Sequence, residues 1–207
     1  MGGTMTAEAP PHMAPAQPDG SPWPVPPENG YTVDDFFRLD LPPHTELIDG
    51  SLVFVSPQRD FHTMTMFVLE RSMQASVPEG FRVRREMAVV LDRRNVPEPD
   101  LIVLSAVAVT DRRRTRYDAA DVHLAVEVVS PDSESRDRDY KPHKYAEAGI
   151  PHFWRVEMSG PHDQVVVYTF ELEPTTKKYV PTGVHRDQLK VDVPYPISVD
   201  LTEIDRM

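Results

Sequence analysis

Three residues of types that together handle metal ions and phosphate stand at separate positions in this 207-residue chain. Asp100 directly precedes an apolar run, Glu127 lies inside a second apolar run, and Lys141 follows after a polar stretch. Carboxylate oxygens suit Mg²⁺ or Mn²⁺, and such an ion can activate a water and polarise a phosphoryl group. A lysine nearby can offset developing charge. The three residues therefore predict a site for a divalent metal and a phosphate.

Glu127 is conspicuous because of its neighbours. Residues 122–129 are short and rich in β-branched residues, which predicts a strand. On the strand face that carries Glu127, the adjacent residues are Ala125 and Val129. A carboxylate in such surroundings is costly unless it is paired or binds a metal. Asp100 opens the strand predicted at 101–104, so the two acids converge on one ion if these strands are neighbours.

The elements that must position these residues alternate between strands and helices. Asp49-Gly50 between two apolar runs predicts a hairpin over 46–55. An apolar periodicity predicts a helix over 60–76 and alternation predicts a strand over 81–91. Further strands are expected at 152–157, 164–172 and 177–180. These elements predict an α/β (α+β) fold, a mixed β-sheet flanked by helices.

Lys141 depends on a helix that follows Ser130-Pro131. Pro142 is tolerated only in the first turn, so we expect this helix to begin near 137–139 and to end at Gly149. Lys141 then lies in the first turn, where a helix N-terminus also favours anions. Tyr145 lies one turn on, on the same face, and either holds the lysine or packs. Lys144 is a rival cation, but it points about 100° away from Tyr145.

A set of motifs recurs in a definite order along the chain. The set comprises Glu46-Leu47-Ile48-Asp49-Gly50, Pro99-Asp100, residues 127–131, and Asp137, Lys141 and Tyr145 followed by 149–154. Over roughly residues 31–179 this order resembles the Uma-type putative restriction endonucleases of the PD-(D/E)xK nuclease superfamily. The resemblance implies a restriction-endonuclease-like core and a metal-dependent phosphodiesterase, with Asp100 and Glu127 as metal ligands.

One departure from the superfamily pattern concerns its lysine. Val129 stands where the Glu-x-Lys motif has lysine, and the resemblance implies that Lys141 takes over that role. It also adds lesser site candidates. Glu46 either lines the site as a catalytic acid or pairs with an arginine. His62 either reaches the metal site or a phosphate, or makes a structural hydrogen bond.

Glu86 also resembles a recurring acid of the family. It is either a further ligand or supporting residue, or it is neutralised by Arg84 or Arg85. The wider stretch 82–116 holds nine arginines and five acids, although the whole chain has a net charge of −11 and a pI of about 5.1. Arg112, Arg113 and Arg114 lie between the two acid-bearing strands. They either grip a substrate phosphate beside the metal site or form a solvated loop.

Composition sets the remaining bounds. The chain has no cysteine, which excludes disulfides and cysteine-based zinc sites. It has neither an apolar run of membrane-spanning length nor a signal-peptide pattern, so we expect a cytoplasmic protein that does not contact a membrane. Residues 1–30 hold eight of the 22 prolines and no Lys or Arg, which predicts a disordered tail. Residues 31–207 are predicted to form one restriction-endonuclease-like domain.

Two functions from different classes follow. The first is a Mg²⁺- or Mn²⁺-dependent endonuclease that hydrolyses phosphodiester bonds in DNA. The second is a catalytically silent nucleic-acid- or protein-binding module with the same fold, favoured by the missing Glu-x-Lys lysine and the negative net charge. By analogy with restriction-type nucleases, which often cut both strands as dimers, a homodimer is expected.

Overall fold

A six-stranded mixed sheet forms the centre of the protein. The computed structural model describes residues 25–159 and 163–207. The strand order is β10-β9-β8-β7-β5-β3; β7 and β8 run parallel, and the other neighbouring pairs run antiparallel. In chain order the strands are β3 (Phe81–Arg85), β5 (Leu101–Ser105), β7 (Val122–Val128), β8 (His152–Ser159), β9 (Gln164–Glu173) and β10 (Lys178–His185). The predicted mixed sheet is confirmed.

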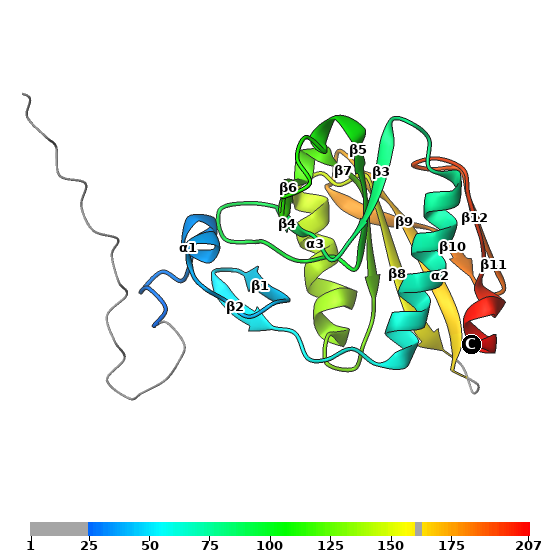
Figure 1. Ribbon diagram of the computed structural model, residues 1–207, viewed down its shortest axis with the longest axis horizontal. Coiled ribbons are helices and arrows are strands. Elements are labelled where there is room, and N and C mark those ends of the chain that lie inside the picture. The colour runs from blue at the N-terminus through cyan, green and yellow to red at the C-terminus, as the bar shows by residue number, and fades with distance from the viewer. Residues whose placement is uncertain (1–24, 160–162) are drawn as a thin grey trace, which may run out of the picture.

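Helices cover both faces of this sheet (Figure 1). On one face, α2 (Asp60–Ser76) packs its apolar side against β7 residues such as Leu124 and Val126. On the other, α3 (Lys141–Glu147) packs Tyr145 against Ala125. Because side chains alternate along a strand, β7 supplies both cores from adjacent residues. Glu127 has the parity of Ala125 and therefore faces α3.

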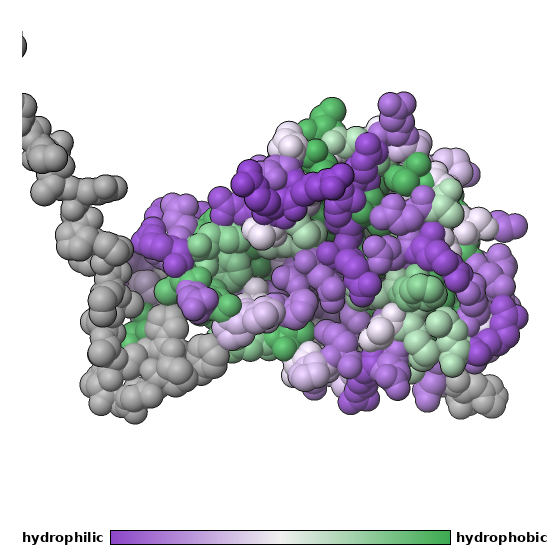
Figure 2. All heavy atoms as spheres, viewed as in Figure 1, coloured by the Kyte–Doolittle hydropathy of each residue, from purple (hydrophilic) through white to green (hydrophobic). Residues whose placement is uncertain are grey.

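A smaller lobe carries Glu46. It consists of α1 (Val33–Arg38) and the antiparallel hairpin of β1 (Thr45–Ile48) and β2 (Ser51–Phe54), packed around a hydrophobic cluster of its own. Figure 2 shows hydrophobic residues, in green, gathered over this part of the molecule and hydrophilic residues, in purple, over most of the rest of the face. Reciprocal backbone hydrogen bonds of 3.0 and 2.8 Å join Leu47 to Val96, so Glu46 arrives beside the segment leading to Asp100.

The predicted strand 81–91 is wrong in one respect, because it breaks at Glu86. This residue has a left-handed φ of 50°, and the chain leaves the main sheet there. The next strand, β4 (Ala88–Val90), instead pairs in parallel with β6 (Arg116–Asp118). The change of direction points the backbone N–H of Glu86 at the carbonyl of Asp100, 3.1 Å away, so the break lies beside the predicted metal ligand.

The remaining elements close the fold. Arg136–Tyr140 form a π-helical turn, η3, that runs into α3, and Pro142 lies in the first turn of α3 as predicted. Short 3₁₀ turns follow two of the strands, at η1 (Ala106–Ala108) and η2 (Ala119–Asp121). The C-terminal part consists of β11 (Gln188–Val191), which pairs with β12 (Ile197–Asp200), and η4 (Leu201–Arg206).

Most of the predicted tail, residues 1–24, lies outside the described residues, so its disorder stays a prediction. The division of the chain into this tail and a single domain also stays a prediction. Among the helices of residues 25–159 and 163–207, none has the length and apolar character needed to cross a membrane.

The Asp49-Gly50 turn predicts a measurable cost for Gly50→Ala. Asp49 and Gly50 have φ of 47° and 79°, and a Cβ on Gly50 would lie 2.6 Å from Arg94 Nη2. We expect the free energy of unfolding, measured with urea, to fall by about 1–2 kcal/mol. Gly80→Ala is the matched control, because a Cβ there meets nothing within 4 Å. Equal stability of the two variants would contradict the turn as described.

Candidate active site

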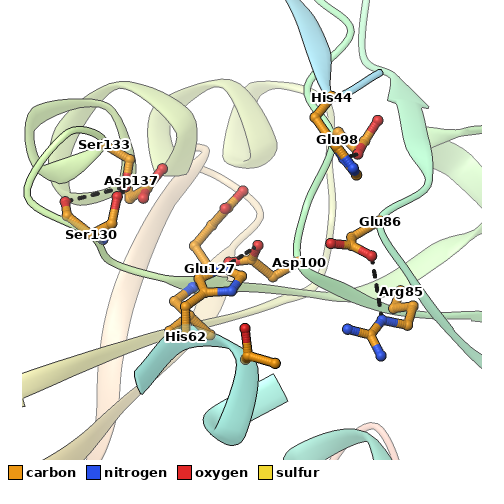
Figure 3. Close-up of polar contacts among 12 residues, drawn as sticks. His44, His62, Arg85, Glu86, Glu98, Asp100, Glu127, Ser130, Ser133 and Asp137 are labelled. Carbon is orange, nitrogen blue, oxygen red and sulfur yellow. Dashed lines mark hydrogen bonds and ion pairs between the residues drawn. The ribbon is translucent and has the colours of Figure 1, made fainter. Parts of the chain in front are cut away.

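The pairing of β5 with β7 brings the two predicted metal ligands together. Leu101 is the register partner of Val126, so Asp100 comes opposite Glu127 at the same end of the strands. Asp100 Oδ2 accepts a 2.6 Å hydrogen bond from the backbone N–H of Val128, which fixes its carboxylate against β7. Figure 3 shows the side chains of Asp100 and Glu127 next to each other. This is the convergence that the sequence predicts.

His62, in the first turn of α2, reaches the same point from the other side of the sheet. Its Nε2 lies 2.8 Å from Asp100 Oδ1, and the imidazole is buried (Figure 3). His62 therefore reaches the predicted metal site, and it does so through a hydrogen bond to one of its carboxylates. Between His62 and Val128, both oxygens of Asp100 are held in place.

Lys141 lies among three carboxylates. Its Nζ is 2.9 Å from Glu46 Oε1, 3.1 Å from Glu127 Oε2 and 3.3 Å from Asp137 Oδ1. All four side chains are at least 94 % buried. Glu46 thus pairs with a lysine rather than with an arginine, and it lines the site. Lys144, the rival cation, turns instead to Asp49 and Glu147.

The charges of this cluster do not balance. Three buried carboxylates surround one ammonium, and Asp100 lies close enough to act on both Glu127 and Asp137. Burial raises the pKa of Glu127 well above its usual value, against the lowering effect of Lys141, and the other acids raise it further. Burial likewise raises the pKa of Asp137. The surplus of negative charge favours a bound proton or a further cation.

The same acids keep Lys141 charged. Burial alone would lower the pKa of its ammonium, but Glu127, Glu46 and Asp137 together raise that pKa well above the usual value. Tyr145 donates a short hydrogen bond from its hydroxyl to Glu127 Oε1. Burial, with Glu127 and Glu46, raises the pKa of Tyr145, so this hydroxyl stays a donor. Lys141 and Tyr145 together hold both oxygens of Glu127.

A cleft lies at Asp100, the residue opposite Glu127. A cavity of about 310 Å³ is lined by residues that include His44, Glu86, Glu98 and Asp100. His44 Nδ1 lies 2.6 Å from Glu98 Oε1. Burial raises the pKa of Glu98, and Glu98 raises the pKa of His44 through their hydrogen bond. Glu86 also lines the cavity, and it lies 3.4 Å from Arg85 Nε, so the pairing with an arginine is observed while its role as a ligand or supporting residue stays a prediction.

Glu98, Asp137 and His44 are site residues that sequence reasoning missed. Glu98 stands two residues before Asp100, and its backbone N–H donates a 2.9 Å hydrogen bond to Glu46 Oε1. Asp137 precedes Lys141 by four residues, which is helical ion-pair spacing and was a usable signal. His44 carried no such signal, because its left-handed φ of 57° turns it toward Glu98.

The arginine loop does not lie beside the carboxylates. The loop follows the last residue of β5, whereas Asp100 precedes the first, so Arg112, Arg113 and Arg114 lie toward the opposite end of that strand. Arg113 pairs with Asp111 and is 90 % exposed. Arg114 donates to the carbonyl of Ala108. The prediction of a phosphate grip next to the metal site is therefore wrong, and the solvated loop is the reading that fits.

The carboxylate oxygens of this site are ligands of the type that a hard divalent cation prefers. Glu46 Oε2 is buried without a hydrogen-bond partner among residues 25–159 and 163–207, and the surrounding oxygens are carboxylates. The arrangement is not that of a preformed metal cage. Within those ranges, no three His, Cys, Asp or Glu side chains are already grouped so as to hold an ion. Lys141 is the cation that lies between them.

Comparison with known proteins identifies a family and a similar fold. The model of the family Uma2, described as "Putative restriction endonuclease", matches residues 33–202. A solved structure, that of a putative nuclease belonging to DUF820 from Anabaena variabilis ATCC 29413, superposes with a TM-score of 0.57 at 16 % identity. The match covers 79 % of this chain and 89 % of that chain. At this identity the likeness shows the fold. No curated protein matches this sequence.

Proposed function

Because this chain belongs to the Uma2 family of putative restriction endonucleases, we propose that it is a metal-dependent endonuclease that hydrolyses phosphodiester bonds in DNA. One observation carries the proposal beyond the family: Asp100, Glu127 and Lys141 come from three separate segments and meet at one end of the sheet. A buried, acid-rich cluster is costly to build for stability alone, and Asp100 opposite Glu127 lines a cleft. That cost supports a catalytic role.

In this proposal, Asp100 and Glu127 hold Mg²⁺ or Mn²⁺, and the free Oε2 of Glu46 is a further oxygen donor. When bound, the ion supplies an activated water and polarises the phosphoryl group. Other residues of the protein orient the metal-binding carboxylates and the attacking water. His62 fixes the carboxylate of Asp100, while Tyr145 fixes that of Glu127. Lys141, kept protonated by its acids, orients the attacking water or offsets the charge that develops on phosphate.

Plasmid DNA incubated with the protein tests this function. With EDTA we expect no conversion of supercoiled DNA, and with Mg²⁺ or Mn²⁺ we expect nicked and linear products. Calorimetry supplies the second readout, because metal binding should release or absorb heat that disappears in Glu127→Gln. Cleavage that proceeds equally in EDTA, or no cleavage of any DNA form with either metal, counts against the proposal.

A catalytically silent binding module is the second candidate. It is favoured by the position of Lys141, whose ammonium lies within 3.3 Å of Glu46, Glu127 and Asp137 and so supplies a positive charge among these carboxylates. Such a module needs no metal at Asp100 and Glu127. The calorimetric comparison separates the two functions: a silent module shows no Mg²⁺ or Mn²⁺ heat that depends on Glu127.

A further inference from the structure

A second hollow lies beside the carboxylate cleft. It has a volume of about 130 Å³, and it shares the wall formed by residues 55–58 with the larger cavity that Asp100 lines. Its other side is formed by the segment between β7 and α3, the segment that also carries Asp137. The lining outside the shared wall is Phe54, Arg59, Ser130, Asp132, Ser133 and Arg136.

The two arginines of this hollow have no partners. In the part of the chain that the structure describes, neither Arg59 nor Arg136 makes a side-chain hydrogen bond or ion pair, and Arg136 Nε is a buried donor left unsatisfied. Arg138, two residues on, differs sharply. Its guanidinium is compensated by Glu134 and Glu157. An unsatisfied buried donor is costly, so a partner for Arg136 is expected.

The charge and shape of the hollow select the partner. Two guanidinium groups face one exposed carboxylate, Asp132, which leaves one positive charge in excess. Ser130 and Ser133 add hydroxyls that lie 3.0 Å from each other and can turn to donate. An anion of single charge with several oxygens matches this set, and guanidinium groups bind such anions with two parallel hydrogen bonds. A phosphodiester is such an anion.

We propose that this hollow binds a backbone phosphate of the DNA strand, next to the phosphate that is cut, through Arg136 and Arg59. The inference rests on the proposed function, since it takes DNA as the ligand. It answers a difficulty of that function, because a chain with a net charge of −11 and an acidic cleft otherwise repels DNA. The hollow would grip the strand on one side of the carboxylates and set which bond faces them.

Binding of a fluorescein-labelled DNA duplex, followed by anisotropy, tests the proposal without cleavage. The titrations use the full chain in EDTA and again in Ca²⁺, with Arg136→Met, Arg59→Met and the charge-preserving Arg136→Lys. Neutralising one phosphate-binding arginine should weaken binding about tenfold at low salt and reduce the slope of log K against log salt by about 0.9. Arg136→Lys should recover the slope and part of the affinity.

Arg71→Met is the matched control, because Arg71, which lies on α2, carries the same charge and is paired with Glu203 of η4. Its binding should stay close to that of the wild type. The proposal is overturned if Arg136→Met binds DNA as Arg71→Met does, or if the wild-type chain binds no duplex in either buffer. If the wild-type protein binds DNA in a way that depends on Arg136 but cleaves no DNA, the nuclease function alone is refuted. Failure of the phosphate-binding proposal can therefore be distinguished from failure of the proposed function.

Discussion

Replacing Asp100 by asparagine is expected to lower DNA cleavage by on the order of 10²-fold or more while the protein stays folded. The amide oxygen can still accept the hydrogen bond from the N–H of Val128, so the local geometry survives. The negative charge that would hold a divalent ion is lost. Changes to groups that only support metal ligands already cost about 10–100-fold, and a direct ligand should cost at least as much. Initial rates of plasmid relaxation, measured over a range of Mg²⁺ concentrations, give the effect.

Asp205→Asn is the control for this experiment, because it makes the same chemical change at an exposed carboxylate of η4. Thermal unfolding of both variants separates lost chemistry from lost structure. If Asp100→Asn relaxes plasmid DNA at a rate close to that of Asp205→Asn, Asp100 is not a metal ligand of the site. The metal would then have to be held elsewhere, or the reaction would need none.

Replacing Lys141 by methionine is expected to destabilise the protein by about 3–5 kcal/mol at neutral pH. Methionine keeps much of the side-chain length and removes a cation that lies within 3.3 Å of Glu46, Glu127 and Asp137. Removing one partner of a buried ion pair leaves an uncompensated charge in a poorly solvated place. Urea unfolding gives the change. Lys144→Met, which breaks partly exposed pairs with Asp49 and Glu147, should cost less than about 1 kcal/mol.

The loss should depend on pH in a definite direction. Burial raises the pKa of Glu127 and Asp137 above their ordinary values of 4.5 and 3.8, so the folded state binds protons more strongly than the unfolded state. Stability therefore falls as pH rises from the ordinary to the raised pKa. Lys141 lowers the pKa of Glu127 and of Asp137, so without it both pKa values rise further. The pH range over which stability falls then extends to higher pH. The deficit of Lys141→Met should thus be largest near neutrality and shrink toward pH 4; a deficit that grows on acidification would contradict the account.

The sequence predicted the meeting of Asp100 and Glu127 because adjacent strands carry them at the same end. That inference needed only strand assignment and the assumption that neighbouring runs pair, and β5 and β7 do pair. The position of Lys141 also followed from local rules, since Pro142 restricts where the helix begins. Local sequence patterns were sufficient to predict a residue's position wherever that position depends on its own helix or strand and on the next one along the chain.

Prediction failed where tertiary geometry decides. The apolar alternation over 81–91 continues through Glu86, yet the chain turns there into a left-handed conformation and pairs with β6, a strand far along the sequence. The partnership of His44 with Glu98 joins two loops more than fifty residues apart. The arginine loop was placed by its sequence position between two acidic strands, but an antiparallel pair puts its connecting loop at the end away from Asp100.

The hairpin that carries Glu46 belongs to a lobe with its own small hydrophobic cluster, and Glu46 reaches Lys141 only when that lobe rests against the main sheet. Docking of the lobe against the sheet therefore also brings Glu46 into the group of carboxylates around Lys141. A transient local opening that separates the hairpin from the sheet would remove Glu46 from Lys141. The ammonium of Lys141 would then interact only with the remaining carboxylates, those of Glu127 and Asp137. The full set of acids at the candidate site therefore depends on the docking of this lobe as well as on the six-stranded sheet.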